Sequence, residues 1–548
     1  MRVHFIIGIQ PGAPEAPSLT EMTRHVREIC RTWDDELLDA MRIAHNGATP
    51  ASLYSKYEKA FDAGYRERTL AVESLSDIAA LEKLSDNPIV VRAYRRADDG
   101  DKAVRLKIYK RGTPMTLSTL IPSIENLGLS VLQETSHRVS PAINSATNDV
   151  MWVHDFSTEQ SGGQPVVLDE VQEAFEDTML AVLEGRTEDD GFNELVLTAG
   201  INWREAWLLR ATAKHHMQAG FAYSQSYIEE ALSNNPSIAR LLITAFHARF
   251  NPKGPSNADD RVKDVALAEK TVVDALNDVA SLDEDRIIRR FLVLFGAIMR
   301  TNYYQRQANG SPKTYISFKV DSHKVAEIPE PKPYREIFVS GPRVDGVHLR
   351  FGPIARGGLR WSDRREDFRT EVLGLVKAQR VKNAVIVPTG SKGGFYPKQL
   401  PMNGDRTEIY EEGREAYKEF IRGLLDLTDN IVQGEMKTPA NLVRWDDPDP
   451  YLVVAADKGT AQFSDTANAI SDDYNFWLGD AFASGGSVGY DHKAMGITAR
   501  GAWEAVKRHF REMGKDIQSE PFTAAGVGDM SGDVFGNGML LSRQTKLI

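Results

Sequence analysis

The chain has 548 residues, of which 42% are hydrophobic and 26% charged, and its formal net charge is −11. A chain of this length exceeds what one hydrophobic core usually supports, so we expect several compact domains. The composition excludes a fibrous or disordered protein, and the acidic balance argues against binding to nucleic acid, which relies on an excess of Lys and Arg.

The apolar stretches are short and interrupted by charges, and residues 1–9 lack the basic segment and cleavage site of a secretory signal. We therefore expect no membrane association and a cytoplasmic location. The single cysteine, Cys30, excludes an intramolecular disulfide and a cysteine-rich metal cage. We expect Cys30 to be a packing residue, and we expect no metal site.

Residues 1–100 form a mixed segment in which MTRHVREICRTWDDELLDAMRIA has the apolar spacing of a helix. Within residues 101–165, KAVRLKIYKRG alternates like a strand and MTLSTLIPSIENLGL reads as a helix. SVLQETSHRV and DVMWVHDFS then read as two further strands. This β-α-β-β order predicts a small α+β segment that resembles an ACT-like regulatory fold.

Residues 166–310 are predicted to form a helical domain, because long segments such as EAWLLRATAKHHMQAG, SYIEEALSNNPSIARLLITAFHARF and EDRIIRRFLVLFGAIMRTNYY carry apolar stripes at helical spacing. His215 and His216 are neighbours on such a helix and point to different faces, so we expect a structural or solvated role for them rather than metal binding. A Pro-rich segment, EIPEPKPY, then marks the start of an α/β domain assigned to residues 315–480.

The cations of residues 352–395 lie beside glycines or at the start of an apolar strand. Arg356 and Lys392 each precede a Gly-Gly pair, and Lys382 begins KNAVIVP. Glycine next to a cation permits unusual backbone angles and close approach of another group, so we predict an anion site. A dicarboxylic amino acid needs such a site, and each charge-assisted hydrogen bond would contribute roughly 1.5–3 kcal/mol. Burial and neighbouring cations would also lower the pKa of a lysine toward neutrality and fit it for proton exchange.

The segment EVLGLVKAQRVKNA, preceded by RGGLRW and followed by GSKGG, resembles the glutamate dehydrogenases and related amino-acid dehydrogenases, which carry KGGxR, E…xKNA and GGxKGG. The resemblance implies that Lys382 holds the substrate α-carboxylate and that Lys392 activates water. Arg356, with Gly357 and Gly358, stands where the smaller enzymes place a lysine for the side-chain carboxylate. This arginine and a shorter spacing between the two lysines point to the large, bacterial NAD-specific class.

Asp457, in DPDPYLVVAADKGTAQFSDTAN, follows an apolar run and matches the aspartate that passes protons to and from the amino group in this family. On local pattern alone Asp457 could instead cap the next helix. Asp465 is a second candidate for the proton-transfer role.

Ser487 and Thr498 lie in a segment, ASGGSVGYDHKAMGITARG, that resembles the family's entrance to the nucleotide domain. The resemblance places both residues near the nicotinamide, and helix capping is the alternative interpretation. The apolar run PFTAAGVGDMSG then leads to Gly526, Gly528 and Gly532, which would let a pyrophosphate approach the backbone at the start of a helix.

Residues 481–548 are therefore assigned to the start of a Rossmann domain, which we expect to be truncated because only 20 residues follow Gly528. The residue that selects NAD over NADP would lie further on, so the resemblance alone implies NAD. The resemblance also implies a homo-oligomer that oxidises L-glutamate to 2-oxoglutarate and ammonia. Two alternatives stay open: a dehydrogenase of another amino acid, and a non-catalytic, amino-acid-binding regulatory fragment. We expect the 548-residue chain itself to bind substrate weakly and to turn over slowly.

Overall fold

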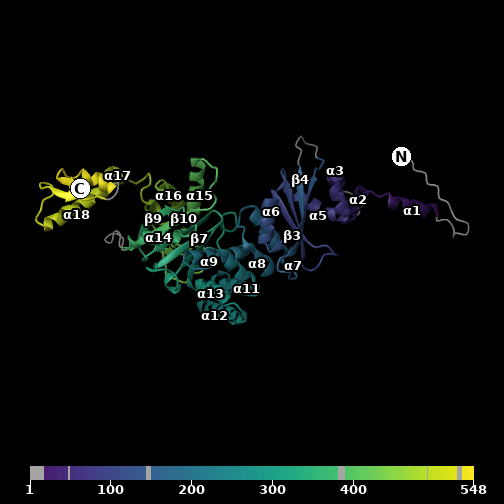
Figure 1. The fold of residues 1–548 in the computed structure, drawn as a ribbon, viewed down its shortest axis with the longest axis horizontal. Coiled ribbons are helices and arrows are strands. Elements are labelled where there is room, and N and C mark those ends of the chain that lie inside the picture. Colours follow the sequence, from purple (N-terminus) through teal and green to yellow (C-terminus); the bar gives the residue numbers. More distant parts are fainter. Residues whose placement is uncertain (1–17, 47–49, 143–149, 381–388, 490–491, 527–532) are drawn as a thin grey trace. The chain divides into compact units, whose positions relative to one another are not determined.

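The computed structural model describes residues 18–46, 50–142, 150–380, 389–489, 492–526 and 533–548. The chain divides into two compact units, Met1–Trp207 and Leu208–Ile548. Figure 1 labels the helices and strands of both units along the chain. Within the described ranges, no helix is both long enough and apolar enough to cross a membrane.

The first unit begins with short helices: α1 (Leu19–Ile29), α2 (Trp33–Ala44), α3 (Ala51–Tyr57), α4 (Ala63–Arg68) and α5 (Ala71–Glu82). The helical pattern predicted across α1 and α2 is broken because Thr32 forms a capping box with Asp35 and starts a new helix there. The expectation that Cys30 packs in a core is wrong. Cys30 is exposed at the end of α1, a helix with no buried residue.

A four-stranded antiparallel sheet follows, in the order β1-β2-β4-β3. Its elements are β1 (Ile89–Tyr94), β2 (Ala103–Arg111), α6 (Leu117–Asn126), β3 (Leu129–Val139), β4 (Met151–Gln160) and α7 (Leu168–Leu183). The predicted β-α-β-β order is confirmed, and β1 is an additional edge strand that the sequence reading did not separate from the mixed segment.

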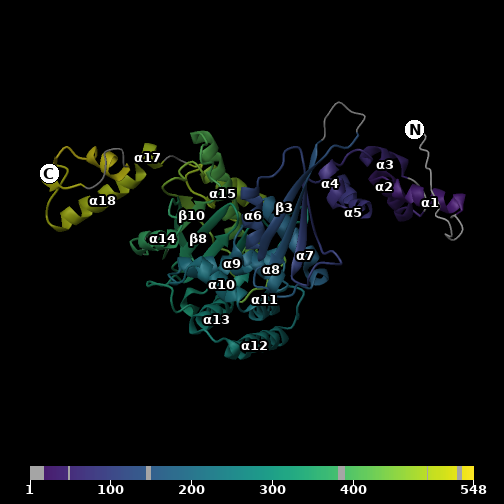
Figure 2. The same cartoon turned by 45° about the vertical axis from the view of Figure 1, so that its right-hand side comes forward.

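Alternation along β2 explains why both faces of this sheet are covered. Leu106 and Ile108 point into a core shared with α6 and α7, whereas Tyr109 points into a second core shared with α2 to α5. Figure 2 shows α6 on one side of the strands and α4 and α5 on the other. The predicted α+β segment is therefore sandwiched between helices on either side.

The helical stretch comprises α8 (Glu194–Thr198), α9 (Trp203–Gln218), α10 (Gln225–Ser233), α11 (Pro236–Phe250), α12 (Ala258–Ala275) and α13 (Leu282–Ala297). The boundary between the two units falls inside α9. The helix expected over SYIEEALSNNPSIARLLITAFHARF is two helices, because Pro236 is the first residue of α11. The last expected helix also ends early, at Ala297, where the chain turns into strand β5 (Ile298–Thr301).

The second unit is built around a seven-stranded sheet in the order β13-β9-β10-β8-β7-β6-β5. Its other strands are β6 (Ile316–Val320), β7 (Arg335–Ser340), β8 (Val344–Arg350), β9 (Ala355–Trp361), β10 (Thr389–Pro397) and β13 (Val454–Ala456). β13, β9 and β10 run parallel, and the remaining pairs are antiparallel. The predicted α/β architecture of this region is confirmed.

Helices cover both faces of the large sheet. On one face, α15 (Arg406–Leu425) and α16 (Ser464–Asp473) enclose an apolar core that includes Leu359, Phe395 and Phe420. On the other face, α14 (Phe368–Lys377) packs against β10, since the side chain of Val372 lies over Gly394. Residues at even positions of β9 and β10 therefore point to the α14 side.

A buried ionic cluster ties α9 and α14 to this second face. The carboxylate of Glu336 on β7 accepts hydrogen bonds from Nε2 of His215 at 2.5 Å and from a guanidinium nitrogen of Arg369 at 2.6 Å. All three side chains are buried. Burial would raise the pKa of Glu336, but Arg369 and His215 outweigh it and lower that pKa to about 2. His216 is also buried, and burial, His215 and Arg290 hold its pKa well below the usual value. The expected structural role of both histidines is confirmed.

The end of the second unit contains α17 (His492–Met495), α18 (Ile497–Glu512), β14 (Phe522–Ala524) and β15 (Thr545–Leu547); a small hairpin of β11 (Asn430–Val432) and β12 (Glu435–Lys437) precedes them in the chain. β14 and β15 pair in parallel, and Trp503, Ile517 and Phe522 form a small core. A parallel pair needs a crossover, which is how a nucleotide-binding domain begins. The assignment of residues 481–548 to such a domain stays a prediction.

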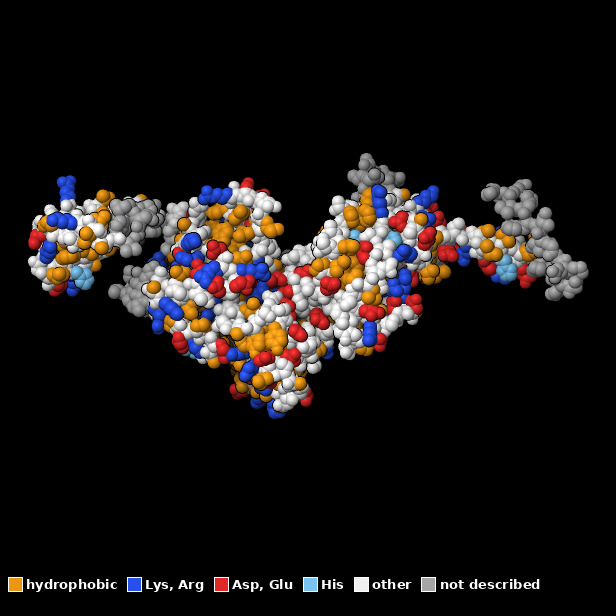
Figure 3. All heavy atoms as spheres, viewed as in Figure 1, with side chains coloured by type: hydrophobic (Ala, Val, Ile, Leu, Met, Phe, Trp, Pro, Cys, Tyr) orange, Lys and Arg blue, Asp and Glu red, His pale blue; other side chains and the backbone are white. Residues whose placement is uncertain are grey.

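On the face of the molecule seen in Figure 3, basic and acidic side chains are interspersed over the sheet-bearing parts of the chain. Within the described residues, this face carries no broad patch of one sign.

Candidate active site

The cations singled out from the sequence come together on the α14 face of the large sheet. β9 and β10 are parallel neighbours, and their register sets Lys392 beside Gly358. Because side chains alternate along a strand, Arg356 and Arg360 point to the same face as Gly358 and Lys392. Two strands thus present three cations around one glycine.

The two glycines after Arg356 are required by close packing of strands. A Cβ on Gly357 would lie 1.5 Å from the carbonyl oxygen of Ser391, and one on Gly358 would lie 2.8 Å from the carbonyl oxygen of Ala456. The expected close approach is present, whereas the expected unusual backbone angle is not, since both glycines lie in extended strand rather than at positive φ. Their predicted contact with substrate stays a prediction.

Lys392 and Asp457 form an ion pair at the centre of this face. Nζ of Lys392 contacts Oδ2 of Asp457, and the lysine is 5% exposed. Asp457 directly follows β13, which pairs in parallel with β9 and so delivers the carboxylate to this position. The helix-capping interpretation of Asp457 is wrong, because α16 begins at Ser464 with Phe463 as its N-cap.

A second cation contacts the same carboxylate oxygen. Nε of Arg360 lies 3.3 Å from Oδ2 of Asp457, and another guanidinium nitrogen of Arg360 lies 3.0 Å from Glu371 on α14. The second oxygen of Glu371 accepts a hydrogen bond from Oγ of Ser362 at 2.6 Å. Two cations and two carboxylates therefore alternate across β10, β13, β9 and α14.

This arrangement favours the ionised form of Asp457. Burial alone would raise its pKa, but the hydrogen bond from Lys392, the backbone N–H of Lys458, the charge of Lys392 and a hydrogen bond from Arg360 lower it overall. Arg360 has its pKa raised, because Glu371 and Asp457 outweigh the opposing effect of burial. Asp457 is thus a charged carboxylate that can accept a proton, and it lies next to the ammonium group of Lys392.

Arg356 lies four residues before Arg360 on β9 and has a different partner. Its guanidinium donates to Oγ of Ser484 at 2.9 Å, and the carbonyl of Ser484 accepts from Oγ of Ser464 at 2.9 Å. Among the described residues, no carboxylate is within ion-pair distance of Arg356. Its positive charge is available to an anionic ligand.

Of the remaining predicted residues, some are described by the structure and others are not. Ser487 is held by Asp465. Oδ1 of Asp465 accepts hydrogen bonds from the backbone N–H of Ser487 at 2.7 Å and from its hydroxyl at 3.1 Å. Asp465 therefore has a positioning partner of its own and does not join the Lys392 pair. Thr498 is exposed in the first turn of α18, and Gly526 follows β14. Lys382, Gly528 and Gly532 lie outside the described residues.

Sequence reasoning assigned no role to Arg360, Glu371 or Ser484. A signal existed for Arg360, because it lies four positions after Arg356 in a strand and must share its face. No local pattern could connect Ser484 to Arg356, since 128 positions separate them.

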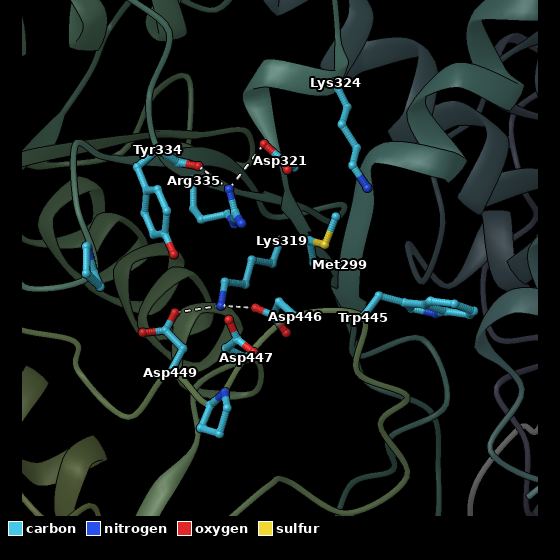
Figure 4. Close-up of a pocket in the computed structure, with 12 residues that line it drawn as sticks. Met299, Lys319, Asp321, Lys324, Tyr334, Arg335, Trp445, Asp446, Asp447 and Asp449 are labelled. Atoms are coloured by element: carbon cyan, nitrogen blue, oxygen red, sulfur yellow. Dashed lines mark hydrogen bonds and ion pairs between the residues drawn. The ribbon is translucent and has the colours of Figure 1, made fainter. Parts of the chain in front are cut away.

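A separate cavity of about 450 Å³ opens at the β5–β6 end of the sheet (Figure 4). Lys319, on its floor, contacts Asp446 at 2.5 Å and Asp449 at 2.6 Å. Arg300 contacts the other oxygen of Asp446, and Arg350 contacts both oxygens of Asp449. Burial would raise the pKa of Asp449, but Arg350 and Lys319 lower it well below the usual value. These charges neutralise one another and fasten the 445–449 loop to the sheet; none of the predicted site residues lines the cavity.

Within the described part of the chain, no group of three or more His, Cys, Asp and Glu side chains is arranged to hold a metal ion.

Family models match most of the chain. The model for the catalytic domain of bacterial NAD-glutamate dehydrogenase matches residues 271–548, which include the whole ion-paired site. Three further glutamate dehydrogenase models match in front of it: the ACT3 domain at residues 88–171, helical motif 3 at residues 187–252 and helical motif 2 at residues 43–84. The expected ACT-like and helical segments are confirmed.

Curated relatives carry the similarity over the full chain. It is 47% identical over 548 residues to an NAD-specific glutamate dehydrogenase of Pseudomonas aeruginosa, covering 100% of the chain and 34% of that protein. It is 46% identical over 549 residues to an NAD-specific glutamate dehydrogenase of Halomonas elongata, covering 100% of the chain and 33% of that protein. The chain thus spans about a third of the length of these relatives.

Among solved structures, the chain is similar to a hetero-hexameric glutamate dehydrogenase from Thermus thermophilus in its Leu-bound form. The identity is 16%, the TM-score is 0.24, and the match covers 45% of this chain and 53% of that one. A score this low supports no argument about the site.

Proposed function

Since this chain belongs to the bacterial NAD-glutamate dehydrogenase family, we propose that it carries the substrate-binding and proton-transferring part of an enzyme that converts L-glutamate, NAD and water into 2-oxoglutarate, ammonia and NADH. The observation that carries the proposal is the ion pair between Lys392 and Asp457, set beside the uncompensated cation of Arg356.

Substrate binding is assigned to the cations of the site. Arg356 would pair with the side-chain carboxylate of glutamate, and Lys382 with the α-carboxylate. Each contact would be a charge-assisted hydrogen bond that contributes roughly 1.5–3 kcal/mol. Gly358 lies on the same face of β9 as Arg356 and has no side chain there, so that a ligand can lie flat against the strand beside Arg356.

Proton transfer is assigned to the ion pair. Asp457, held ionised, would take a proton from the substrate ammonium so that the amine is neutral when the α-carbon loses hydride. Lys392 would then orient a water and, after its ammonium has released one proton to solvent, accept a proton from that water as the C–O bond to the 2-imino carbon forms. Asp457 would return a proton to the departing amine, which leaves as ammonia. The hydroxyl proton of the intermediate would pass to Asp457 as the C–N bond breaks and the carbonyl of 2-oxoglutarate forms.

NAD supplies the hydride acceptor in this reaction. The chain residues that would hold it are Ser487, Thr498 and Gly526, with Gly528 and Gly532. Their fit rests on two features: β14 runs into Gly526 and pairs in parallel with β15, and Asp465 fixes the backbone of Ser487. We also propose a cytoplasmic homo-oligomer as the form in which the whole enzyme acts.

Two other functions fit the site less well. In a dehydrogenase of an apolar amino acid, the cation of Arg356 would face an apolar side chain and stay unpaired, which is unfavourable. A purely regulatory amino-acid-binding module would not need a buried lysine paired with an aspartate that a second cation also contacts.

The test is glutamate-dependent NADH formation by the full-length gene product, measured beside leucine as substrate and beside the variants Lys392→Ala and Lys377→Ala. Lys377 is an exposed lysine of α14 and serves as the matched control. The proposal expects activity with glutamate that Lys392→Ala abolishes and Lys377→Ala preserves. Folded protein without activity on either amino acid would favour the regulatory module instead.

A further inference from the structure

We propose that Arg360 is a positioning residue that orients the carboxylate of Asp457 against Lys392. This inference rests on the proposed function, in which Asp457 exchanges protons with the substrate amine. It assigns a task to a side chain that the substrate itself need not touch.

The contact between Arg360 and Asp457 has the geometry that positioning requires. Nε of Arg360 and Nζ of Lys392 both contact Oδ2 of Asp457, so one oxygen receives two cations from neighbouring strands. A lysine ammonium is a point charge on a flexible chain and leaves a carboxylate free to rotate, whereas a planar guanidinium fixes direction as well as distance. Arg360 therefore supplies the orientation that the lysine alone cannot.

Arg360 is itself held from the opposite side. Glu371 on α14 contacts the guanidinium at 3.0 Å, and Ser362 donates a hydrogen bond to the other oxygen of Glu371 at 2.6 Å. The side chains of Arg360 and Glu371 are 20% and 16% exposed, so solvent screens this contact only in part. α14 thereby determines where Asp457 lies.

Among the residues that the structure describes, the charges that face Asp457 come from three elements. They are Lys392 from β10, Arg360 from β9 and, behind Arg360, Glu371 from α14; the backbone N–H of Lys458 adds a hydrogen bond. Removing the Arg360 charge would make Asp457 easier to protonate. Removing the Glu371 charge would leave the guanidinium to Asp457 alone and make it harder to protonate.

A purely structural role for Arg360 makes a different prediction. If Arg360 only fastened β9 to α14, then Arg360→Gln and Glu371→Gln would break the same contact and have the same effect. The positioning role predicts effects of opposite sign on the pH profile.

The experiment compares Arg360→Gln, Arg360→Lys and Glu371→Gln in the full-length enzyme, with Arg364→Gln as control. Arg364 pairs with Asp367 at the surface, its side chain being 47% exposed. We expect Arg360→Gln to lower kcat by about tenfold or more with a smaller change in KM for glutamate. We expect the acidic limb of the kcat profile to move to higher pH in Arg360→Gln and to lower pH in Glu371→Gln. Arg360→Lys should lie between wild type and Arg360→Gln, and Arg364→Gln should match wild type.

A crystal structure of Arg360→Gln provides a readout that does not depend on turnover. The expected result is an Asp457 carboxylate rotated away from Nζ of Lys392 with β9 and α14 in place. An Asp457 carboxylate that keeps its position in Arg360→Gln would overturn the inference. So would acidic limbs of the kcat pH profiles that move in the same direction in Arg360→Gln and Glu371→Gln. An intact enzyme that does not oxidise glutamate would instead refute the proposed function, while the structure of the variant still decides whether Arg360 positions Asp457.

Discussion

Arg356, on β9, donates a hydrogen bond to the hydroxyl of Ser484 at 2.9 Å. A neutral hydroxyl fixes the direction of the guanidinium without neutralising its charge. Arg356 is therefore oriented in advance and still able to pair with a carboxylate, which is what recognition of an acidic side chain needs.

Replacing Arg356 with Met should raise KM for glutamate by about 10- to 100-fold, because the substrate would lose a charge-assisted hydrogen bond of roughly 1.5–3 kcal/mol. The ratio of kcat/KM for leucine to that for glutamate should rise, since an apolar side chain would no longer face an unpaired cation. Steady-state kinetics with both amino acids measure the change. Ser484→Ala keeps the charge and should raise KM much less; an equal effect of both variants would mean that Arg356 only supports the local fold.

Lys392 allows a direct test of the proposed proton transfer. Lys392→Ala should lower kcat by about 10²- to 10⁴-fold, the usual contribution of a group that transfers protons. Lys392→Arg should not restore it, because a guanidinium does not release its proton at the pH of the reaction. Rapid-mixing measurements of the first turnover would separate loss of chemistry from loss of binding. Full activity in Lys392→Arg would show that only the positive charge matters.

The fold of the individual segments could be predicted from local patterns because their causes are local. The strand pattern along residues 103–111 and the helical spacing along residues 205–218 could be read from neighbouring residues alone, although each element is buried on more than one side. The break at Pro236 was also visible locally, and the prediction of one continuous helix overlooked it. The exposed position of Cys30 was not visible, because α1 has no buried residue to reveal which way it faces.

The site could be predicted only in part, since its contacts depend on strand pairing. The sequence indicated Lys392 and Asp457 separately, each through its neighbours in the chain. Their contact exists because β13 pairs with β9, and β9 with β10. No periodicity reports which strands are adjacent, so the contact of Arg360 with Asp457 and that of Ser484 with Arg356 required the structure.

The ionic cluster under α14 makes stability depend on pH in a defined direction. The pKa of Glu336 is lowered from 4.5 to about 2 in the folded chain. Its contribution to the free energy of unfolding, about 3 kcal/mol, is therefore complete above about pH 4.5 and is lost as the pH falls toward 2. Glu336→Gln should lower the thermal unfolding temperature at neutral pH and should flatten its decline between pH 4.5 and 2. Scanning calorimetry across this range measures both.

Glu366→Gln is the matched control for Glu336, because the Glu366 side chain is 77% exposed. A surface carboxylate of this kind should leave both the unfolding temperature and its pH dependence nearly unchanged. The unfolding temperature of Glu336→Gln could instead fall with acid as steeply as that of wild type. The acid sensitivity would then have to come from other carboxylates, and the cluster with His215 and Arg369 would not be its source.

Two glycine-to-alanine substitutions separate close packing in the site from the general effect of removing a glycine. A Cβ at Gly357 would lie 1.5 Å from the carbonyl oxygen of Ser391, so Gly357→Ala must push β9 away from β10 and displace Lys392 from Asp457. Gly374 lies on the exposed side of α14 with no atom near its Cβ position, and alanine there should stabilise the helix by about 0.5–1 kcal/mol. Gly357→Ala should therefore lower both the unfolding temperature and the activity, while Gly374→Ala should raise the unfolding temperature slightly and leave activity intact. An active and stable Gly357→Ala protein would contradict the close β9–β10 contact on which the geometry of the site depends.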